Sequence, residues 1–323
     1  MGIQLDDSDL GAVIRPFLSV LMTTFNASRF LNEAVESILQ QDYSDFEFIV
    51  VDDGSTDQTR LILDQLSASD RRMRIMHIDH AGISTAANIG LSACVGKIIA
   101  RMDGDDVAKP HRFRTQLEYL RQVDAVCVGS FVDFIDAKGR FLTTIESPVA
   151  DAAIQEALLA GHTALWQTGA MFRREAVERI GGYDKDFDCA QDLDLWLRLG
   201  EIGRLGNVPQ SLQCYRLHHQ AVSETKRDRQ HDLCLMACER AWKRRGVRGR
   251  FKEGDPWRPG KDRYSRQHCA LRYGWWAFNS GHRRTALNYG VVAVLNRPID
   301  LASWRLLLCA AVKRCPRHGA ATS

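Results

Sequence analysis

The sequence contains no apolar run of the roughly 18 to 20 residues that a membrane-spanning helix needs, and its first nine residues are polar and acidic. Its nine cysteines form no CxxC pair, and their odd number argues against a disulfide framework or a zinc site. We therefore expect a cytoplasmic protein whose cysteines are mostly buried thiols.

Charge is distributed unevenly along the 323 residues. Residues 219–323 contain 22 Lys and Arg against 8 Asp and Glu, whereas residues 1–218 contain 21 against 32. With 45% hydrophobic residues, the chain can bury one large core and carry an appendage. An acidic body and a basic tail suggest that the two parts meet different partners.

Short apolar runs alternate with segments of helical periodicity, which is typical of an α/β fold with a doubly wound, mostly parallel sheet. We expect strands at residues 19–24, 46–51, 72–78, 97–102 and 125–129. We expect helices at residues 29–40, 59–67, 85–94 and 110–123, the first of them capped by Ser28. Residues 131–136 and 139–145 then predict a hairpin, where the alternation ends.

Carboxylates follow the expected strand 97–102, in the segment Asp103-Gly104-Asp105-Asp106. Open α/β sheets bind ligands at the carboxyl ends of their strands, and paired carboxylates suit Mg²⁺ or Mn²⁺ bound together with a substrate phosphate. An acidic turn without a ligand is the alternative, because Asp-Gly is a common turn signal.

Eight segments together resemble the family 2 glycosyltransferases, in order and in spacing. They are residues 19–26 (SVLMTTFN), 50–57 (VVDDGSTD), 82–90 (GISTAANIG), 103–106 (DGDD), 169–174 (GAMFRR), 181–184 (GGYD), 191–198 (QDLDLWLR) and 215–218 (YRLH). The resemblance implies a GT-A fold over residues 17–222, preceded by a tail at 1–16 and followed by a basic, Trp-rich helical region at 223–323.

The resemblance also implies roles for six residues in an inverting hexosyltransferase. Thr23, Asp53 and Asp103 would bind the nucleotide-sugar donor, which we expect to be UDP-linked. Asp105 and His218 would hold Mn²⁺ or Mg²⁺, and Asp192 would be the catalytic base.

Each role has an alternative. Asp53 also suits a turn or helix cap, although Asp52 suits that role better. His219 is easily confused with His218, and Asp192 also suits the dipole of the helix that it begins. The chain departs from the family at Met22 or Thr23, where proline is frequent, and in two further positions: Ala87, where Arg is frequent, and Gln191, where Glu is frequent.

The region after residue 222 lies outside the resemblance. It predicts helices at residues 228–245, 264–279, 283–295 and 301–312, with a Pro/Gly/basic linker at 253–261, and it contains five of the seven Trp. A helical cap on the catalytic domain is one reading. The other is a platform for an anionic membrane or a lipid-linked acceptor, peripheral on the inner face of the cytoplasmic membrane. No nucleic-acid motif accompanies the charge, so we expect no nucleic-acid partner.

The sequence thus predicts transfer of a sugar to a hydroxyl of a glycan or lipid-linked acceptor in surface polysaccharide synthesis. A nucleotidyltransferase would share the sheet, but residues 23–29 lack the glycine-rich, lysine-bearing phosphate loop that it needs. A non-catalytic nucleotide- or glycan-binding module would lack the base, so the presence of Asp192 argues against it.

Overall fold

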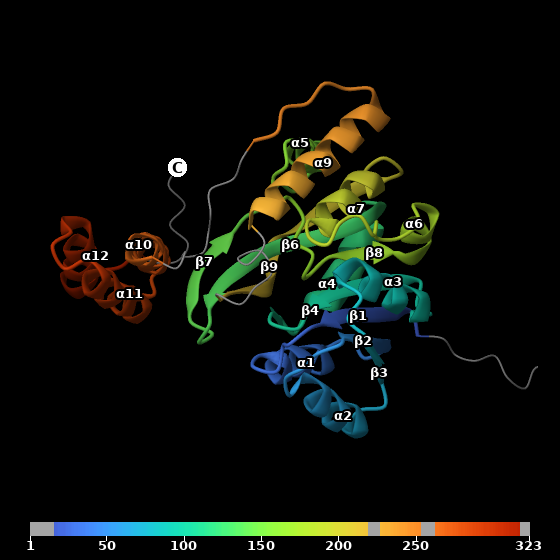
Figure 1. Cartoon of the computed structure of the whole chain (residues 1–323), viewed down its shortest axis with the longest axis horizontal. Coiled ribbons are helices and arrows are strands. Elements are labelled where there is room, and N and C mark those ends of the chain that lie inside the picture. Colours follow the sequence, from blue (N-terminus) through green and yellow to red (C-terminus); the bar gives the residue numbers. More distant parts are fainter. Residues whose placement is uncertain (1–15, 219–226, 253–261, 317–323) are drawn as a thin grey trace, which may run out of the picture.

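The computed structural model describes residues 16–218, 227–252 and 262–316; the tail and the linker predicted at 253–261 lie outside these ranges. The described residues form a nine-stranded sheet in the order β3-β2-β1-β4-β8-β6-β9-β5, with β7 paired to β6 (Figure 1). Helices cover both faces of this sheet, and a helical unit stands apart at one side of the molecule (Figure 1). The expected α/β fold class with a helical C-terminal extension is confirmed.

The first four strands are parallel, and they lie within two residues of the predicted bounds. They are β1 (Leu18–Thr24), β2 (Phe46–Asp53), β3 (Met73–Ile78) and β4 (Ile98–Asp103). β1 lies between β2 and β4, and Thr23 pairs in register with Val51 on one side and Asp103 on the other. This register brings the ends of β1 and β4 together at the carboxyl edge of the sheet.

Two apolar layers hold the sheet between its helices. One face packs against α1 (Leu31–Leu39), α2 (Thr59–Ser69) and α4 (Arg112–Gln122). The other packs against α3 (Ile83–Ala93), α5 (Asp151–Leu159), α6 (Arg174–Arg179), α7 (Gln191–Leu199) and α9 (Arg227–Arg245). Parallel strands buried on both faces account for the nearly continuous apolar runs of β1, β2 and β4.

The cap predicted for the first helix is wrong. α1 begins at Leu31, its N-cap residue is Phe30, and no side chain caps it. Ser28 lies in the preceding turn, where its backbone N–H donates to Asp57 Oδ2 at 3.2 Å. The side chain that binds this turn therefore comes from the loop after β2, which local sequence does not reveal.

The second half of the sheet mixes strand directions. β6 (Ala125–Asp136) is one strand of 12 residues, and it pairs with β7 (Phe141–Ile145) in the predicted hairpin. β6 also pairs with β8 (Met171–Arg173) and β9 (Arg204–Leu217), and β9 pairs with the two-residue β5 (Val107–Ala108). β9 thereby returns to the loop after β4, so that its last residues lie beside the acidic segment.

The C-terminal helices have two different surroundings. α9 buries Leu233, Ala237, Cys238 and Ala241 in the same core as α7 and α5. α10 (Arg263–Asn279), α11 (Arg283–Asn296) and α12 (Leu301–Val312) form a helical unit around a small apolar cluster of their own. Cys269 and Tyr273 of α10 also share a buried cluster with Val132, Phe134 and Leu217 of the sheet, so the unit packs against the sheet through α10. None of the helices within the described ranges is long and apolar enough to cross a membrane.

Candidate active site

The acidic segment after β4 lies against the end of β9. Asp105 Oδ2 and His218 Nε2 are 2.8 Å apart, and both residues had been predicted to hold a metal. His218 is almost fully buried, and its other ring nitrogen, Nδ1, has no hydrogen-bond partner among the described residues. His219, the alternative to His218, lies outside the described ranges.

Arg216 fixes this arrangement from the interior. Its backbone N–H donates to Asp106 Oδ1 at 2.7 Å, and its Nε donates to the carbonyl oxygen of Asp105 at 2.8 Å. Its Nη2 reaches Glu33 Oε2 on α1 at 2.7 Å. Because Arg216 is two residues before His218, these bonds set the loop of Asp105 and the position of His218 together.

A second buried arginine stands behind the first carboxylate. Arg101 is fully buried, its Nη2 lies 3.6 Å from Asp103 Oδ1, and the same nitrogen donates to Thr23 Oγ1 at 3.2 Å. Thr23 and Asp103 thus share one cation. Since the Thr23 hydroxyl accepts from Arg101, its own hydrogen remains free to donate to a ligand.

Asp53 lies at the end of β2, where its carboxylate supports the start of α3. Oδ1 accepts from the backbone N–H of Ala81 at 2.7 Å, and Oδ2 accepts from that of Gly82 at 3.0 Å. His80 Nδ1 lies 3.0 Å from Oδ2. A carboxylate has about four acceptor positions, so these bonds leave room for a nucleoside N–H or hydroxyl.

An exposed aromatic pair adjoins Asp53. The rings of Phe25 and His80 stack with their centroids 4.5 Å apart. Phe25 is 48% exposed, so one face of this stack is open to solvent. The pair offers a flat face at the same edge as Thr23 and Asp53.

Asp192 is the second residue of α7, as the sequence predicts. Its Oδ1 accepts from the N–H of Leu193 at 2.9 Å. Ala190, just before the helix, has a left-handed φ of 58°, which strains the backbone of a residue with a Cβ. This turn sets the direction in which α7 starts.

A chain of side-chain amides links the start of α7 to β4. Gln191 Nε2 donates to Gln167 Oε1 at 3.0 Å, and Gln167 Nε2 donates to Asp103 Oδ1 at 3.4 Å. Gln191 stands where glutamate is frequent in the resembling family, and here it supplies the N–H that Gln167 accepts. The same helix contains a purely structural carboxylate, because Asp194 is buried in an ion pair with Arg198 at 2.6 Å.

Burial and mutual repulsion disfavour the ionised form of several carboxyl groups in the site. Burial raises the pKa of Asp103 to about 6, against the opposing effect of Arg101 and with the charges of Asp105 and Asp192 adding to the rise. Burial, Asp105 and Asp103 raise the pKa of Asp106 well above its usual range. The pKa of Asp192 is also raised, again mainly by burial. A bound cation would relieve this repulsion.

The residues present fit a divalent cation. Neighbouring ligands of an octahedral Mg²⁺ ion lie about 3 Å apart, since each is about 2.1 Å from the metal, and the Asp105 and His218 donor atoms are 2.8 Å apart. Within the described ranges no group of three His, Cys, Asp or Glu side chains could hold an ion. The remaining ligands would therefore be water and substrate phosphate, as Mg²⁺ commonly requires.

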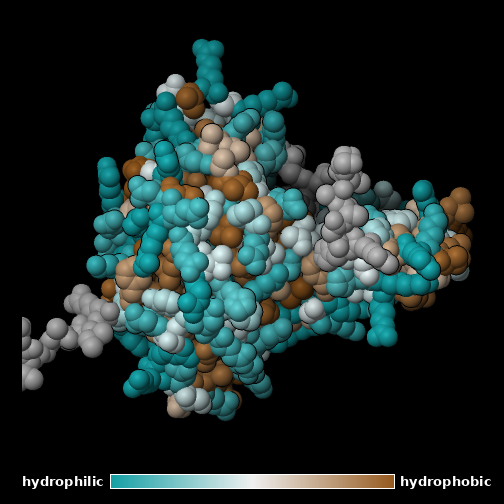
Figure 2. Space-filling view, turned by 180° about the vertical axis from the view of Figure 1, so that it is seen from behind, coloured by the Kyte–Doolittle hydropathy of each residue, from teal (hydrophilic) through white to brown (hydrophobic). Residues whose placement is uncertain are grey.

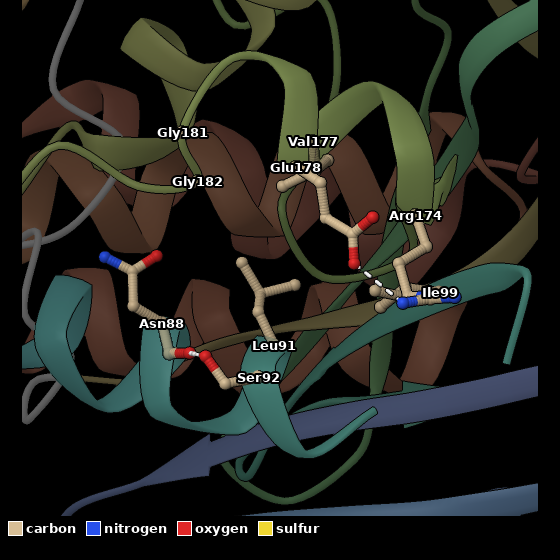
Figure 3. A pocket seen from close by; sticks show the side chains of 9 residues that line it. All are labelled: Asn88, Leu91, Ser92, Ile99, Arg174, Val177, Glu178, Gly181 and Gly182. Atoms are coloured by element: carbon tan, nitrogen blue, oxygen red, sulfur yellow. Dashed lines mark hydrogen bonds and ion pairs between the residues drawn. The ribbon is translucent and has the colours of Figure 1, made fainter. Parts of the chain in front are cut away.

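Two cavities lie among the described residues, and the first is away from this edge, beside Ile99 near the start of β4. One, of about 360 Å³, lies between α3 and α6, where Asn88 points toward the turn of Gly181 and Gly182 (Figure 3). Asn88 makes two hydrogen bonds to the backbone of Tyr183, at 2.8 and 2.9 Å, and a Cβ on Gly182 would lie 2.5 Å from Asn88 Oδ1. This first cavity contains none of the predicted site residues, and its polar groups join two motifs structurally.

The other cavity, of about 300 Å³, includes His218 in its lining. It lies where the end of β9 meets α10, α11 and the β6–β7 turn. Its lining includes the basic and aromatic side chains Lys138, Arg140, Arg266, Tyr273 and Tyr289, together with Asp136, which pairs with Arg140 at 2.7 Å. Such a lining suits a sugar or an anionic group, and it is contiguous with the Asp105–His218 pair.

The structure therefore brings five of the six predicted residues to one edge through shared partners, and Asp53 to the neighbouring strand end. Arg101, Gln167 and Arg216 contribute to this arrangement, although no role was predicted for them. Arg101 carried a usable signal, because a lone arginine in an apolar strand two residues before a carboxylate pair must find a buried partner. Gln167 carried none.

Comparison with known proteins gives a matching family. The sequence pattern described as Glycosyl transferase family 2 matches residues 19–181. The chain is 32% identical over 227 residues to an uncharacterized glycosyltransferase of Haemophilus influenzae, covering 67% of this chain and 70% of that protein. It is 30% identical over 216 residues to the O-antigen biosynthesis glycosyltransferase WbnJ of Escherichia coli, covering 66% and 84%.

Solved structures share the fold. S. aureus TarS 1–349 in complex with UDP-GlcNAc matches with a TM-score of 0.57 at 13% identity, covering 91% of this chain and 87% of that chain. The mannosyltransferase PcManGT from Pyrobaculum calidifontis, in complex with GDP-Man and Mn²⁺, matches with a TM-score of 0.55 at 19% identity, covering 93% and 80%. At these identities the likeness concerns the fold alone.

Proposed function

Because the chain belongs to glycosyl transferase family 2 and has the GT-A fold, we propose that this glycosyltransferase is inverting and metal-dependent, with a UDP-linked sugar as its donor. The observation that carries the proposal is the convergence of Thr23, Asp103, Asp105 and His218 on one sheet edge, with Asp192 close enough to raise the pKa of Asp103.

The nucleoside half of the donor is assigned to the ends of β1 and β2. The free hydrogen of Thr23 suits a base carbonyl, and the spare acceptor positions of Asp53 suit a base N–H or a ribose hydroxyl. The exposed Phe25–His80 stack supports this assignment, since a flat ring face suits a base. TarS and PcManGT bind UDP-GlcNAc and GDP-Man in the solved complexes, which supports a nucleotide-sugar donor in general.

The diphosphate half belongs at Asp105 and His218, with Asp103 beside them. When bound there, Mn²⁺ or Mg²⁺ would stabilise the negative charge of the departing diphosphate. The chain's part is to hold the two ligands in place through Arg216 and to balance Asp103 with Arg101.

Asp192 is proposed as the base that takes the proton of the acceptor hydroxyl. Its raised pKa suits this task, because a carboxylate with a pKa nearer neutrality takes a proton more readily than an ordinary aspartate. Inversion needs one carboxylate and no covalent sugar intermediate.

We further propose that the acceptor is a glycan or lipid-linked hydroxyl compound of surface polysaccharide synthesis. The similarity to WbnJ, named for O-antigen biosynthesis, supports this class. The basic and aromatic cavity beside His218 supports it from the structure.

A panel of nucleotide-sugars tests the proposal. Full-length protein should melt at a higher temperature with one UDP-sugar and Mn²⁺, and the rise should disappear with EDTA. The same sugar should be slowly hydrolysed. Stabilisation by nucleoside triphosphates and not by any nucleotide-sugar would overturn the donor assignment.

A further inference from the structure

The hairpin of α11 and α12 ends in exposed aliphatic side chains. Leu295, Ile299 and Leu301 are 76%, 90% and 84% exposed, and they surround the turn between the two helices. We call these three residues the apolar tip. Figure 1 shows this unit at one side of the molecule, and Figure 2 shows hydrophobic residues gathered at its outer end.

The exposed apolar surface continues along α12. Leu308 and Val312 are 59% and 80% exposed, and they follow Leu301 at the i+7 and i+11 positions of one helix face. Single exposed aliphatic residues are common, but a contiguous group of this kind marks an interaction surface.

Aromatic side chains flank the tip. Trp304 is 42% exposed, and its Nε1 donates to the carbonyl oxygen of Pro298 at 2.7 Å. Tyr264 is 63% exposed, and the Arg297 guanidinium lies over its ring, 5.3 Å from the centroid. Tryptophan and tyrosine are favoured where an apolar region meets water, because each has an apolar body and one polar group.

The charge of this unit is mostly positive. Between residues 262 and 316 the sequence has nine Lys and Arg and two acidic residues, Asp262, which caps α10, and Asp300. Asp300 is occupied in capping α12, where it accepts from the N–H of Ser303 at 2.9 Å, and it also accepts from Gln267 at 2.8 Å. The basic residues are Arg263, Arg266, Arg272, Arg283, Arg284, Arg297, Arg305, Lys313 and Arg314.

We propose that the apolar tip and the adjoining face of α12 dock on an anionic phospholipid surface, with the aliphatic side chains entering the boundary between headgroups and acyl chains. Basic residues beside them would then meet lipid phosphates. A second copy of this chain fits less well. A symmetric contact would bring the basic side chains Arg297, Arg305 and Lys313 of the two copies close together, and like charges repel. Nucleic acid would neutralise the charge but leave the aliphatic residues in water.

Docking through the apolar tip would bring the cavity that contains His218 close to the membrane surface. Val292 of α11 lies one helical turn from Leu295 and lines the cavity that contains His218. A lipid-linked acceptor held in the membrane would therefore approach the cavity along α11. Docking itself does not depend on the sugar transferred, so it stands apart from the proposed reaction.

Vesicle flotation with the full-length protein tests the proposal. The protein should float with phosphatidylglycerol-containing vesicles at low ionic strength, less with pure phosphatidylcholine, and less as salt rises. The triple variant Leu295→Ser/Ile299→Ser/Leu301→Ser should lose at least tenfold in vesicle affinity, with unchanged melting temperature and gel-filtration volume. Leu61→Ser is the matched control, because Leu61 is 57% exposed on α2, far along the chain from the tip, and it should float as the wild type does.

A second readout locates the contact. The double variant Arg305→Gln/Lys313→Gln should weaken vesicle binding by about fivefold per residue, the effect of one basic side chain near an anionic surface. Lipids brominated in the acyl chain should quench wild-type tryptophan fluorescence more than that of Trp304→Phe. Failure of the wild type to bind anionic vesicles, or equal binding by the triple variant, would overturn the proposal. So would a wild-type dimer that the triple variant converts to a monomer, because the tip would then bind a second copy.

Discussion

Arg101 Nη2 lies 3.6 Å from Asp103 Oδ1, so a fully buried cation stands directly behind the first carboxylate of the acidic segment. The same guanidinium donates to Leu21 O and to Thr23 Oγ1. It therefore fixes the ends of β1 and β4 relative to each other and lowers the pKa that burial gives to Asp103. This arrangement balances part of the negative charge before any ligand binds.

Asp105→Asn should weaken UDP binding in the presence of Mn²⁺ by roughly ten- to a hundredfold, about 1.4 to 2.8 kcal/mol, because one anionic ligand is lost. The fold should survive, since Asp105 is partly exposed. Titration calorimetry with Mn²⁺ and with EDTA measures the difference. If the wild type binds UDP equally well in both conditions, Asp105 does not hold a metal.

Arg216→Lys should weaken the same metal-dependent binding although Arg216 lies behind the ligands. A lysine cannot make both hydrogen bonds of Arg216, to the carbonyl oxygen of Asp105 and to Glu33 Oε2. Because a buried acceptor then lacks its donor, the free energy of unfolding should fall by about 1 to 3 kcal/mol.

Glu33→Gln is the companion variant for Arg216, because the Glu33 side chain is 55% exposed and the glutamine oxygen can still accept the hydrogen bond from Arg216. It should bind UDP and melt almost as the wild type does. If Arg216→Lys binds UDP normally at a temperature where it is folded, Arg216 does not position Asp105.

Much of the first half of the fold could be predicted from sequence, because strands buried on both faces are short apolar runs between amphipathic helices. β6 was predicted as two strands that break near Ser130. The structure has one strand, but its register with β9 shifts between Ser130 and Phe131 and again before Val132. The break in the apolar alternation near Ser130 therefore marks a bulge within one strand. A bulge interrupts the alternation of side chains in the same way as a turn between two strands.

Long-range contacts set the limit of sequence reasoning. α9 is strongly basic, yet its small and apolar residues Ala237, Cys238 and Ala241 pack beside α7, which its composition does not indicate. In the candidate site, the motifs that resemble the family predicted roles for Asp103, Asp105 and Asp192. The amide chain through Gln167 depends on a residue that is 64 positions from Asp103.

Arg266→Ala should raise the KM for the acceptor and leave donor hydrolysis unchanged, because Arg266 lines the cavity beside His218 on α10, whereas the proposed nucleoside-binding residues Thr23 and Asp53 lie on β1 and β2. We expect about a tenfold rise, the effect of one hydrogen bond to a charged group. Arg263→Ala on the same helix is the control, since Arg263 is exposed and outside the cavity. Equal KM values for the two variants would show that the acceptor does not bind in this cavity.

Gln191→Glu should destabilise the protein by about 1 to 3 kcal/mol, although glutamate is frequent at this position in the family. Glutamate has no N–H to donate, so it would face Gln167 Oε1 at 3.0 Å as a second acceptor. Turning the Gln167 amide would restore that bond but remove its N–H from Asp103. Thermal unfolding measures the change, with Gln191→Met as an uncharged control. A variant as stable as the wild type and faster in turnover would show that the amide chain is dispensable.

Asp192→Asn is nearly isosteric and should preserve folding and donor binding. It should lower kcat by about 10² to 10⁴, the usual contribution of a general base. The wild-type product should have the anomeric configuration opposite to that of the donor, which NMR detects. Near-normal turnover in Asp192→Asn would assign the base elsewhere.

The pH profile of the wild type tests the same residue independently. Burial raises the pKa of Asp192, and the base acts only when ionised. Activity should therefore be full above this raised pKa and should fall as the pH drops through it, at a higher pH than for an exposed aspartate with a pKa of about 3.9. Donor affinity, measured over the same range, separates this effect from the titration of Asp103, whose pKa is about 6. In Asp192→Asn the residual kcat should lose its acid limb. If the limb persists unchanged in that variant, the titrating group is not Asp192, and the acceptor proton must go to another residue.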